Sequence, residues 1–209
     1  GFEIGQIRTL PYSAPNDGVS QIAERLVTIH QEDWDSCELS WDFTISPLFR
    51  QGILSTNLEN TFQRLVAHVD SLIVETHSCE RQINAVFARA FGLSDSVRID
   101  VPDEHITLYR PDPEEDIKRL LSYATGCMMG RYSLDEPGLI YAHSGNEGFD
   151  PSKYSTFPAD DDGIIPITDV AWFPDDAAHR FEEFIKTVWP EEHLEENLTF
   201  VAESLSKKK

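Results

Sequence analysis

Few side chains in this sequence combine the residue types and the spacing that metal binding requires. The run Asp160-Asp161-Asp162 could offer oxygen ligands to a hard cation, but three consecutive side chains point in different directions and the spaced acids of a calcium loop are missing. His77 and Cys79 are two residues apart on an expected helix, so they face different sides of it, and no third ligand stands nearby. We therefore predict a solvated acidic loop and no metal site.

The motifs of catalysis and cofactor binding are also missing. The seven histidines offer nominal partners for a nucleophile, but no serine stands in a Gly-x-Ser-x-Gly turn. No Gly-rich dinucleotide fingerprint and no Walker phosphate loop occur either. The sequence alone therefore predicts no catalytic residue and no cofactor bound by this chain.

Cysteine spacing and hydropathy bear on the cellular compartment. Cys37, Cys79 and Cys127 show no paired spacing, which fits neither a disulfide framework nor a zinc site. No run of about eighteen apolar residues occurs, and the first residues, GFEIGQIRTLPY, lack the basic and apolar regions of an export signal. We expect reduced, mostly buried thiols in a cytoplasmic protein that contacts no membrane.

The charge of the chain argues against a large surface for nucleic acid. Its 209 residues include 37 acidic and 17 basic side chains, and the formal net charge of -20 repels a polyanion at long range. Acids dominate after residue 150, whereas arginines concentrate in the middle of the chain. This asymmetry leaves room for one locally basic face. The central arginines include Arg64, Arg81, Arg89, Arg98, Arg110, Arg119 and Arg131.

The elements that would position these groups are mainly helical. Between residues 57 and 91, apolar residues recur at alternating steps of four and three, which predicts one long heptad helix that ends before Gly92. We expect it to pack in a hairpin against a shorter helix that begins near Asn16, with an intermolecular coiled coil as the alternative. The seam consists of Leu58, Phe62, Leu65, Val69, Leu72, Thr76, Cys79, Ile83, Val86 and Ala90.

Two stretches with alternating apolar residues, near 2-8 and 97-109, predict small β elements. Between the two predicted helices, Trp34, Trp41 and Phe43 lie in a segment without a sustained helical period, which indicates a packed aromatic loop. The predicted fold class is therefore mainly α: a helical hairpin or bundle built on the long helix, with small β elements.

The second half of the chain begins with a strong helix start. Asp112, followed by a proline and an acidic first turn, predicts a helix in which Gly126 and Gly130 indicate the close approach of another backbone. Residues 133–167 are rich in Gly, Pro, Asp and Ser, and form either a functional loop or an extension laid over the domain. Two amphipathic helices are expected between residue 174 and the C-terminal end.

Several strings resemble one family of enzymes. The run EDWDSCELSWDFTISPLF at 32–49 resembles the DWDS-E-SWDF block that follows the catalytic domain of BREX-type adenine-specific DNA methyltransferases of the PglX family. The run LLSYATGCMMGRYSLDEPGLIYA at 120–142 resembles a later block of the same proteins, SYAVGCMFGRYSLD-GL-YA. FEIGQIRTLPY and CERQINAVFARAFGL are similar to further stretches in the same order, so the likeness covers nearly the whole chain.

The resemblance implies a parent enzyme in which a Rossmann-like domain binds S-adenosylmethionine and an Asn-Pro-Pro-Tyr motif presents a flipped adenine. Neither that motif nor the cofactor loop occurs here, so no catalytic or cofactor-binding residue carries over. The chain then resembles an internal fragment. Residues 1-15 would be a strand junction to the catalytic domain, 16-132 a helical spacer region, and 133-206 a loop-rich extension with two C-terminal helices; all three can form one domain.

Two roles follow from the resemblance. In the first, the chain is a spacer close to the DNA-reading elements of an enzyme that marks self DNA in phage defence. Arg131, Arg119 and Arg110 would contact the DNA backbone, with a salt bridge to a neighbouring acid as the alternative for Arg131. Trp34, Trp41 and Phe43 would dock on the catalytic domain.

In the second role, the chain is a docking platform for other BREX system proteins, with the acidic C-terminal third as the contact surface. Mimicry of DNA by the acids is disfavoured, because the long helix carries both signs of charge and the acids cluster in loops.

Overall fold

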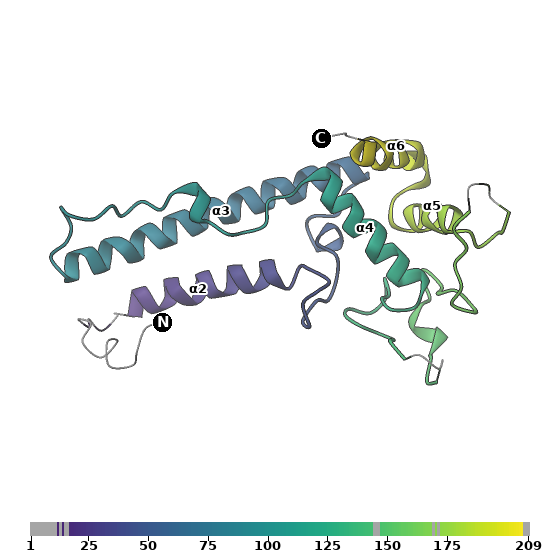
Figure 1. Ribbon diagram of the computed structural model, residues 1–209, viewed down its shortest axis with the longest axis horizontal. Helices are drawn as coiled ribbons and strands as arrows, with labels where there is room; N and C mark the ends of the chain where they lie inside the picture. Colours follow the sequence, from purple (N-terminus) through teal and green to yellow (C-terminus); the bar gives the residue numbers. More distant parts are fainter. Residues whose placement is uncertain are drawn as a thin grey trace. The chain divides into compact units, whose positions relative to one another are not determined.

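The protein is mainly α-helical, as predicted. The structure is a computed structural model that describes residues 12, 14, 17–143, 147–168, 170 and 172–206, and it contains no β-strand within them. Short 3-10 turns connect several of the helices (Figure 1). The α-helices are α2 (Asp17–Trp34), α3 (Leu58–Ala90), α4 (Pro113–Met128), α5 (Ala177–Val188) and α6 (Leu194–Ser206). None of the described helices has the length and the apolar content needed to span a bilayer.

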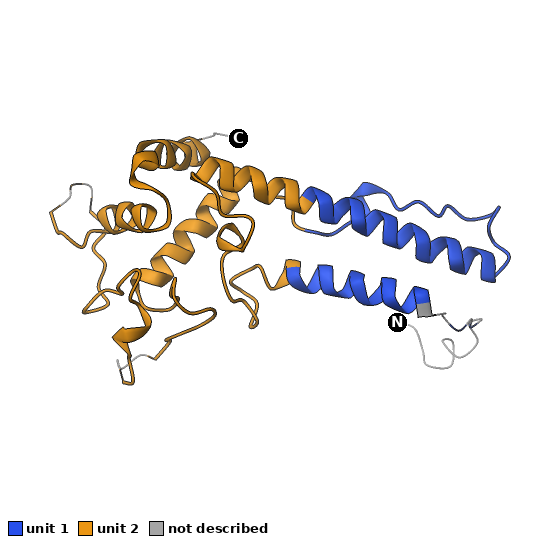
Figure 2. Cartoon of the chain, turned by 180° about the vertical axis from the view of Figure 1, so that it is seen from behind, with its two compact units in different colours: residues 1–32, 70–108 blue, residues 33–69, 109–209 orange. Residues whose placement is uncertain are grey.

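The chain forms two compact units (Figure 2). Unit 1 comprises residues 1–32 and 70–108, and unit 2 comprises residues 33–69 and 109–209. The boundary divides α3 after Val69, so the first part of this helix belongs to unit 2 and the rest to unit 1.

Unit 1 is built on the predicted helical hairpin. The guanidinium of Arg25 in α2 donates two hydrogen bonds, of 2.7 and 2.8 Å, to the carboxylate of Glu75 in α3. Ile29 of α2 is fully buried, and Ile73 and Cys79 of α3 are buried as well. The two helices run antiparallel within this unit (Figure 2). The predicted partnership of the long helix with the shorter helix before it is therefore confirmed.

The buried face of α3 departs from the predicted heptad seam in its second half. Ile73 is buried where the seam predicts Leu72, which is half-buried, and Ala88 is buried whereas Ala90 is exposed. The cause is the helix itself: a straight α-helix has 3.6 residues per turn, so a strict seven-residue repeat drifts by about 20° per heptad. Thr61 is buried beside the residues that follow the 3.6-residue period and are buried along the first five turns: Leu58, Phe62, Leu65, Val69, Ile73 and Thr76.

The predicted β element at 97-109 is wrong. This segment contains a 3-10 turn at Asp103–His105 between irregular stretches. It lies along α3, where Asn84 donates a hydrogen bond of 3.1 Å to the carbonyl oxygen of Ile99, and Arg81 pairs with Asp100 at 3.0 Å. Ile106 and Leu108 are buried, so the alternating pattern is real. An extended segment that buries one side on a helix has the same two-residue period as a strand. The β element predicted near 2-8 lies outside the described residues.

Unit 2 is organised around α4. Its start is the predicted one, because the side chain of Asp112 accepts a hydrogen bond from the backbone N–H of Glu115 and proline follows directly. The ring of Phe49 packs against the rings of Tyr123 in α4, Phe184 in α5 and Trp189. The packed aromatic loop is therefore confirmed for Phe43, Leu48 and Phe49, whereas Trp34 and Trp41 are exposed.

The segment after α4 lies over the C-terminal end of that helix. The hydroxyl of Tyr154 donates to the carbonyl oxygen of Gly130 at 2.6 Å, and the hydroxyl of Ser133 donates to that of Lys153 at 2.6 Å. The backbone N–H of Asp160 donates to the carbonyl oxygen of Met128 at 2.7 Å. Of the two alternatives for residues 133–167, these contacts favour the extension laid over the domain.

The two glycines near the end of α4 leave room for aromatic rings, not for another backbone as predicted. A Cβ on Gly126 would lie 2.8 Å from Cε2 of Tyr132, and one on Gly130 would lie 2.9 Å from Cε2 of Phe149. Gly130 also has a φ of +71°, the left-handed conformation that ends many helices. A glycine allows the close approach of an aromatic ring just as it allows the close approach of another backbone. The two glycines in the sequence therefore did not show which of these neighbours would lie against them.

Candidate functional site

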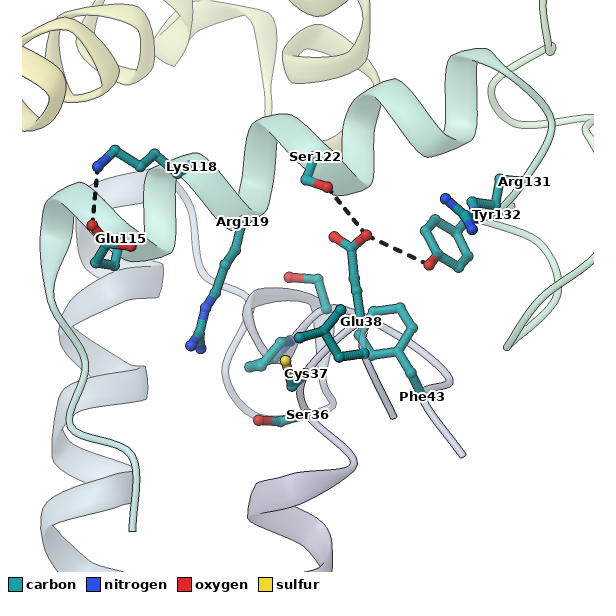
Figure 3. Close-up of a pocket in the computed structure, with 13 residues that line it drawn as sticks. Ser36, Cys37, Glu38, Phe43, Glu115, Lys118, Arg119, Ser122, Arg131 and Tyr132 are labelled. Atoms are coloured by element: carbon teal, nitrogen blue, oxygen red, sulfur yellow. Dashed lines mark hydrogen bonds and ion pairs between the residues drawn. The ribbon is translucent and has the colours of Figure 1, made fainter. Parts of the chain in front are cut away.

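The loop after α2 is held by short-range hydrogen bonds from its own acids and serines. Both carboxylate oxygens of Asp33 accept from the backbone N–H of Tyr109 at 3.2 Å. Ser40 donates to Asp35 at 2.6 Å, and Ser36 donates to the carbonyl oxygen of Asp33 at 2.6 Å. These bonds give the first family-like block a defined shape and direct Glu38 toward α4 (Figure 3).

The segment that follows α4 is held just as firmly. The backbone N–H of Tyr132 donates to the carbonyl oxygen of Gly126, and its ring stacks on Tyr123 with centroids 5.1 Å apart. Asp135 accepts hydrogen bonds from the backbone N–H and the hydroxyl of Thr156. These bonds give Tyr132 and Asp135 roles inside unit 2, whereas Arg131 is exposed.

The two family-like blocks meet at Glu38. One oxygen of its carboxylate, Oε2, accepts from the hydroxyl of Ser122 at 3.1 Å and from that of Tyr132 at 3.5 Å (Figure 3). Burial raises the pKa of this carboxyl, an effect that the two hydroxyls and Arg131 oppose. The other oxygen, Oε1, accepts no hydrogen bond from any residue in the described part of the chain.

Glu38 stands at a cleft between this loop and α4. The cleft has a volume of about 480 Å³, within the range of about 300–1,000 Å³ that is common for small-molecule sites. A second hollow of about 370 Å³ continues along the same face of α4 and shares Glu38, Ser122 and Arg131 with the first. We call the two hollows together the α4 groove. Further along, Thr125, Gly126 and Met129 line it.

Three cations line the α4 groove, and they differ in how far neighbouring groups satisfy them. Lys118 pairs with Glu114 at 2.7 Å and with Glu115 at 2.9 Å, and these hydrogen bonds raise its pKa. The guanidinium of Arg119 lies 3.9 Å from the centroid of the Tyr109 ring, a cation–π contact, and 3.9 Å from the carboxylate of Asp116.

Arg131 has no comparable partner. Its guanidinium lies 6.0 Å from the centroid of the Tyr132 ring, and it forms no ion pair with any acid among the described residues. The salt bridge that was the alternative for this residue is therefore not seen. An exposed guanidinium beside a cleft keeps its planar set of N–H donors available for a carboxylate or a phosphate.

The structure brings together some of the predicted site residues and separates others. Arg119 and Arg131 line the same cleft, whereas Arg110 is exposed outside it. Trp34 and Trp41 are exposed, but Phe43 is only 6% exposed and packs edge-on against Tyr123 and Tyr132. Phe43 is therefore a core residue, and docking on another domain stays a prediction for Trp34 and Trp41 alone.

Sequence reasoning missed Glu38 and Ser122. Glu38 stands inside the first family-like block, between Trp34 and Ser36 on one side and Ser40 and Trp41 on the other. An acidic residue in such a segment was the signal that could have pointed to a functional carboxylate. Its partner Ser122 is 84 residues away, so the pairing depends on the fold.

The acidic run at 160–162 forms a turn. The carboxylate of Asp160 accepts from the backbone N–H groups of Asp162 at 3.2 Å, Gly163 at 2.8 Å and Ile164 at 3.2 Å. Within the described residues, no group of three His, Cys, Asp or Glu side chains could hold a metal ion.

Comparison with known proteins supports the family. No protein-family model matches the chain. The chain is 36% identical, over 223 residues and 98% of its length, to the adenine-specific methyltransferase BrxX of Escherichia coli O9:H4 (strain HS). It is 36% identical, over 219 residues and 99% of its length, to the adenine-specific methyltransferase PglX of Lacticaseibacillus casei (strain Zhang). In both cases it spans 18% of the length of the relative. The chain belongs to the BREX PglX-type family of adenine-specific methyltransferases.

Proposed function

We propose that this chain is the spacer and recognition-proximal region of an S-adenosylmethionine-dependent, adenine-specific DNA methyltransferase that marks self DNA in BREX phage defence. The relatives carry the name adenine-specific methyltransferase, and the chain matches 18% of their length. The observation that supports a DNA contact is the exposed guanidinium of Arg131 on the α4 groove, which forms no ion pair with any described acid and lies on the same cleft as Arg119. Both side chains offer N–H donors to phosphate oxygens.

The net charge of -20 makes this contact a local one. At physiological ionic strength charges are screened over about 8 Å, so acids that lie further away oppose a phosphate at the groove only weakly. Few phosphates are engaged, so binding by this chain is weak and the rest of the parent enzyme supplies most of the affinity.

The spacer role is supported by α3. A continuous helix of 33 residues is about 50 Å long at 1.5 Å per residue. Its start is capped from within unit 2, where Asn57 accepts from the backbone N–H of Asn60 at 2.8 Å. A long, capped helix suits a segment that separates two working parts.

The methyl donor does not fit the described part of this chain. The Asn-Pro-Pro-Tyr motif is missing from the sequence, and the described residues contain no strand on which a cofactor-binding sheet could be built. We therefore place S-adenosylmethionine and methyl transfer in the remainder of the parent methyltransferase.

The test is substitution of Arg131 in the parent enzyme, with DNA binding and adenine methylation as readouts. Loss of one phosphate contact is expected to weaken binding about equally for all DNA sequences. It should also reduce, by roughly one, the steepness with which the logarithm of the binding constant falls with the logarithm of the salt concentration, measured between about 50 and 200 mM salt. Arg131→Ala and Arg119→Ala are compared with Arg98→Ala, an exposed arginine of unit 1. If Arg131→Ala leaves both readouts at the level of Arg98→Ala, the DNA contact is refuted.

A second candidate function is docking of other defence proteins on the acidic C-terminal third. A mainly apolar hollow of about 450 Å³ supports it; its lining includes Met129, Ile164, Ile167 and Phe181, and Asp161 stands nearby in the chain. Capture of other BREX proteins that is lost in Asp161→Lys would favour this function. Asp161 is the suitable position because Asp160 and Asp162 hold the turn by accepting backbone N–H groups.

A further inference from the structure

We propose that the α4 groove takes an unstacked nucleotide, with Glu38 Oε1 accepting a hydrogen bond from an amino group of the base and Arg131 binding the adjacent phosphate. This inference rests on the proposed DNA contact and adds a residue that senses the base. Phosphate contacts carry no sequence information, whereas a hydrogen bond to a base does.

The geometry of Glu38 suits this role. Its Oε2 is held by Ser122 and Tyr132, which fixes the direction of the carboxylate, and its Oε1 has no partner among the described residues (Figure 3). An ionised carboxylate only accepts hydrogen bonds, so it favours a base that offers an N–H donor. Because Oε1 has no partner among the described residues, it is available to a ligand that supplies one donor.

The surroundings of Glu38 suit a base followed by a phosphate. The cleft of about 480 Å³ can hold a nucleobase, and its inner wall is formed by the buried rings of Phe43 and Tyr132. The guanidinium of Arg131 lies on the same cleft as the carboxylate of Glu38. A nucleotide presents the matching pair, a neutral donor and an anion.

The mouth of the cleft carries a side chain that could keep a base out of its stack. Leu39 follows Glu38 directly, lines the cleft and is 83% exposed. Apolar side chains of this kind insert between base steps in proteins that unstack DNA. Extruding a base from a duplex breaks its stacking and pairing, so the groove favours single-stranded or already distorted DNA.

The competing explanation is that Glu38 only anchors its loop to α4 through Ser122 and Tyr132. That role predicts the same binding for every base. The amino-group hypothesis predicts that adenine binds better than unsubstituted purine, which is the same ring system without the amino group.

The experiment measures the binding of short single-stranded oligonucleotides to the full chain by fluorescence anisotropy, at low salt and near pH 8. One oligonucleotide carries adenine and the other carries unsubstituted purine at the same positions. The wild-type chain is expected to bind the adenine strand about tenfold more tightly. Glu38→Gln, which replaces the free acceptor by an amide, is expected to abolish this preference, and Arg131→Ala to weaken both strands equally.

Glu195→Gln is the matched control, because it makes the same change at an exposed acid of α6 that does not line the groove. Its preference for adenine should persist. Melting temperatures of the three variants show whether each is folded. If Glu195→Gln loses the preference as Glu38→Gln does, the lost charge and not the free acceptor decides it, and the proposal is overturned.

The remaining outcomes separate this inference from the proposed function. If the wild-type chain binds the adenine and the purine strand equally and Arg131→Ala weakens the binding of both, the phosphate contact is supported and base recognition by Glu38 is refuted. A duplex of each strand with its complement is measured as well, and tighter binding of the duplexes without any dependence on the amino group refutes the unstacked base. Absence of binding to every strand refutes the inference, whereas the phosphate contact is decided separately by Arg131→Ala in the parent enzyme.

Discussion

Asn197 in α6 accepts a hydrogen bond from the backbone N–H of Leu58, the first residue of α3, at 2.7 Å. The two residues are 139 positions apart, and Asn197 is only 1% exposed. The first N–H groups of an α-helix have no partner within the helix, so a buried helix start needs one from elsewhere. The long helix therefore begins against the last helix of the chain.

We predict that Asn197→Ala lowers the free energy of unfolding by about 1–2 kcal/mol, because the buried N–H of Leu58 loses its acceptor. Chemical denaturation followed by circular dichroism measures this change. Thr199→Ala, at an exposed position two residues further along α6, should have little effect. An equal loss in the two variants would mean that the cap is not the cause.

We predict that Gly126→Ala destabilises the protein by about 1–3 kcal/mol. The added methyl group would collide with the ring of Tyr132, which is buried and stacked on Tyr123 and has little room to move. Thr125→Ala, one residue earlier and exposed, is the control in the same denaturation experiment. Similar midpoints for both variants would contradict a tight contact between Gly126 and the ring.

A third prediction concerns Asp116, which is 4% exposed and accepts a hydrogen bond from the backbone N–H of Asp112. Burial raises the pKa of this carboxyl to about 6, from an ordinary value of 3.8. Between these two values the folded state holds a proton that the unfolded state has lost. The contribution to stability is therefore fully present below about pH 4 and is lost as the pH rises through about 6, by about 3 kcal/mol in all.

Asp116→Asn keeps an acceptor for the N–H of Asp112 and cannot ionise. We expect wild type and variant to have similar stability near pH 4, and the variant to become the more stable one by pH 7. Denaturation series across this pH range measure the difference, and Asp161→Asn, at an exposed acid, is the control. Parallel curves for wild type and Asp116→Asn would show that the carboxyl titrates normally.

A fourth prediction uses the cysteines to report on the groove. Cys37 is partly exposed and lines the cleft, whereas Cys79 and Cys127 are buried. Burial raises the pKa of the two buried thiols, that of Cys127 to about 12, so few reactive thiolates form there. We expect iodoacetamide to label Cys37 first and bound DNA to slow that labelling.

Peptide mass spectrometry separates the three sites, and the two buried cysteines serve as internal controls. DNA should leave their labelling rates unchanged, because these depend on opening of the fold. Unchanged labelling of Cys37 at saturating DNA would place the DNA contact away from the cleft.

Local patterns predicted most of the helices. The helix start at Asp112 depends on a cap and a proline within three residues, and both can be read without any tertiary information. The long helix is equally local, since its apolar residues recur at helical spacing. Its buried face was predicted less well, because the heptad repeat assigned Leu72 where the real period of the helix buries Ile73.

The candidate site was predicted only in part. Arg119 and Arg131 stood out as central arginines, but whether an arginine is paired depends on which acids the fold brings within reach. The fold satisfies Arg119 with Tyr109 and leaves Arg131 without an ion pair among the described residues. Phe43 illustrates the opposite case, since an aromatic residue in a loop is equally consistent with a docking surface and with the core.

The sequence by itself therefore determined the helical class of this protein, the long helix that ends before Gly92, and the family, since all of these depend on residues that are close together along the chain. Tertiary structure alone decided that Glu38 faces Ser122, that the segment at 97–108 packs on a helix and that Asn197 caps α3. These relationships join residues that are 15 to 139 positions apart. Burial and hydrogen bonding at such separations depend on how elements pack, which periodicity within one element does not specify.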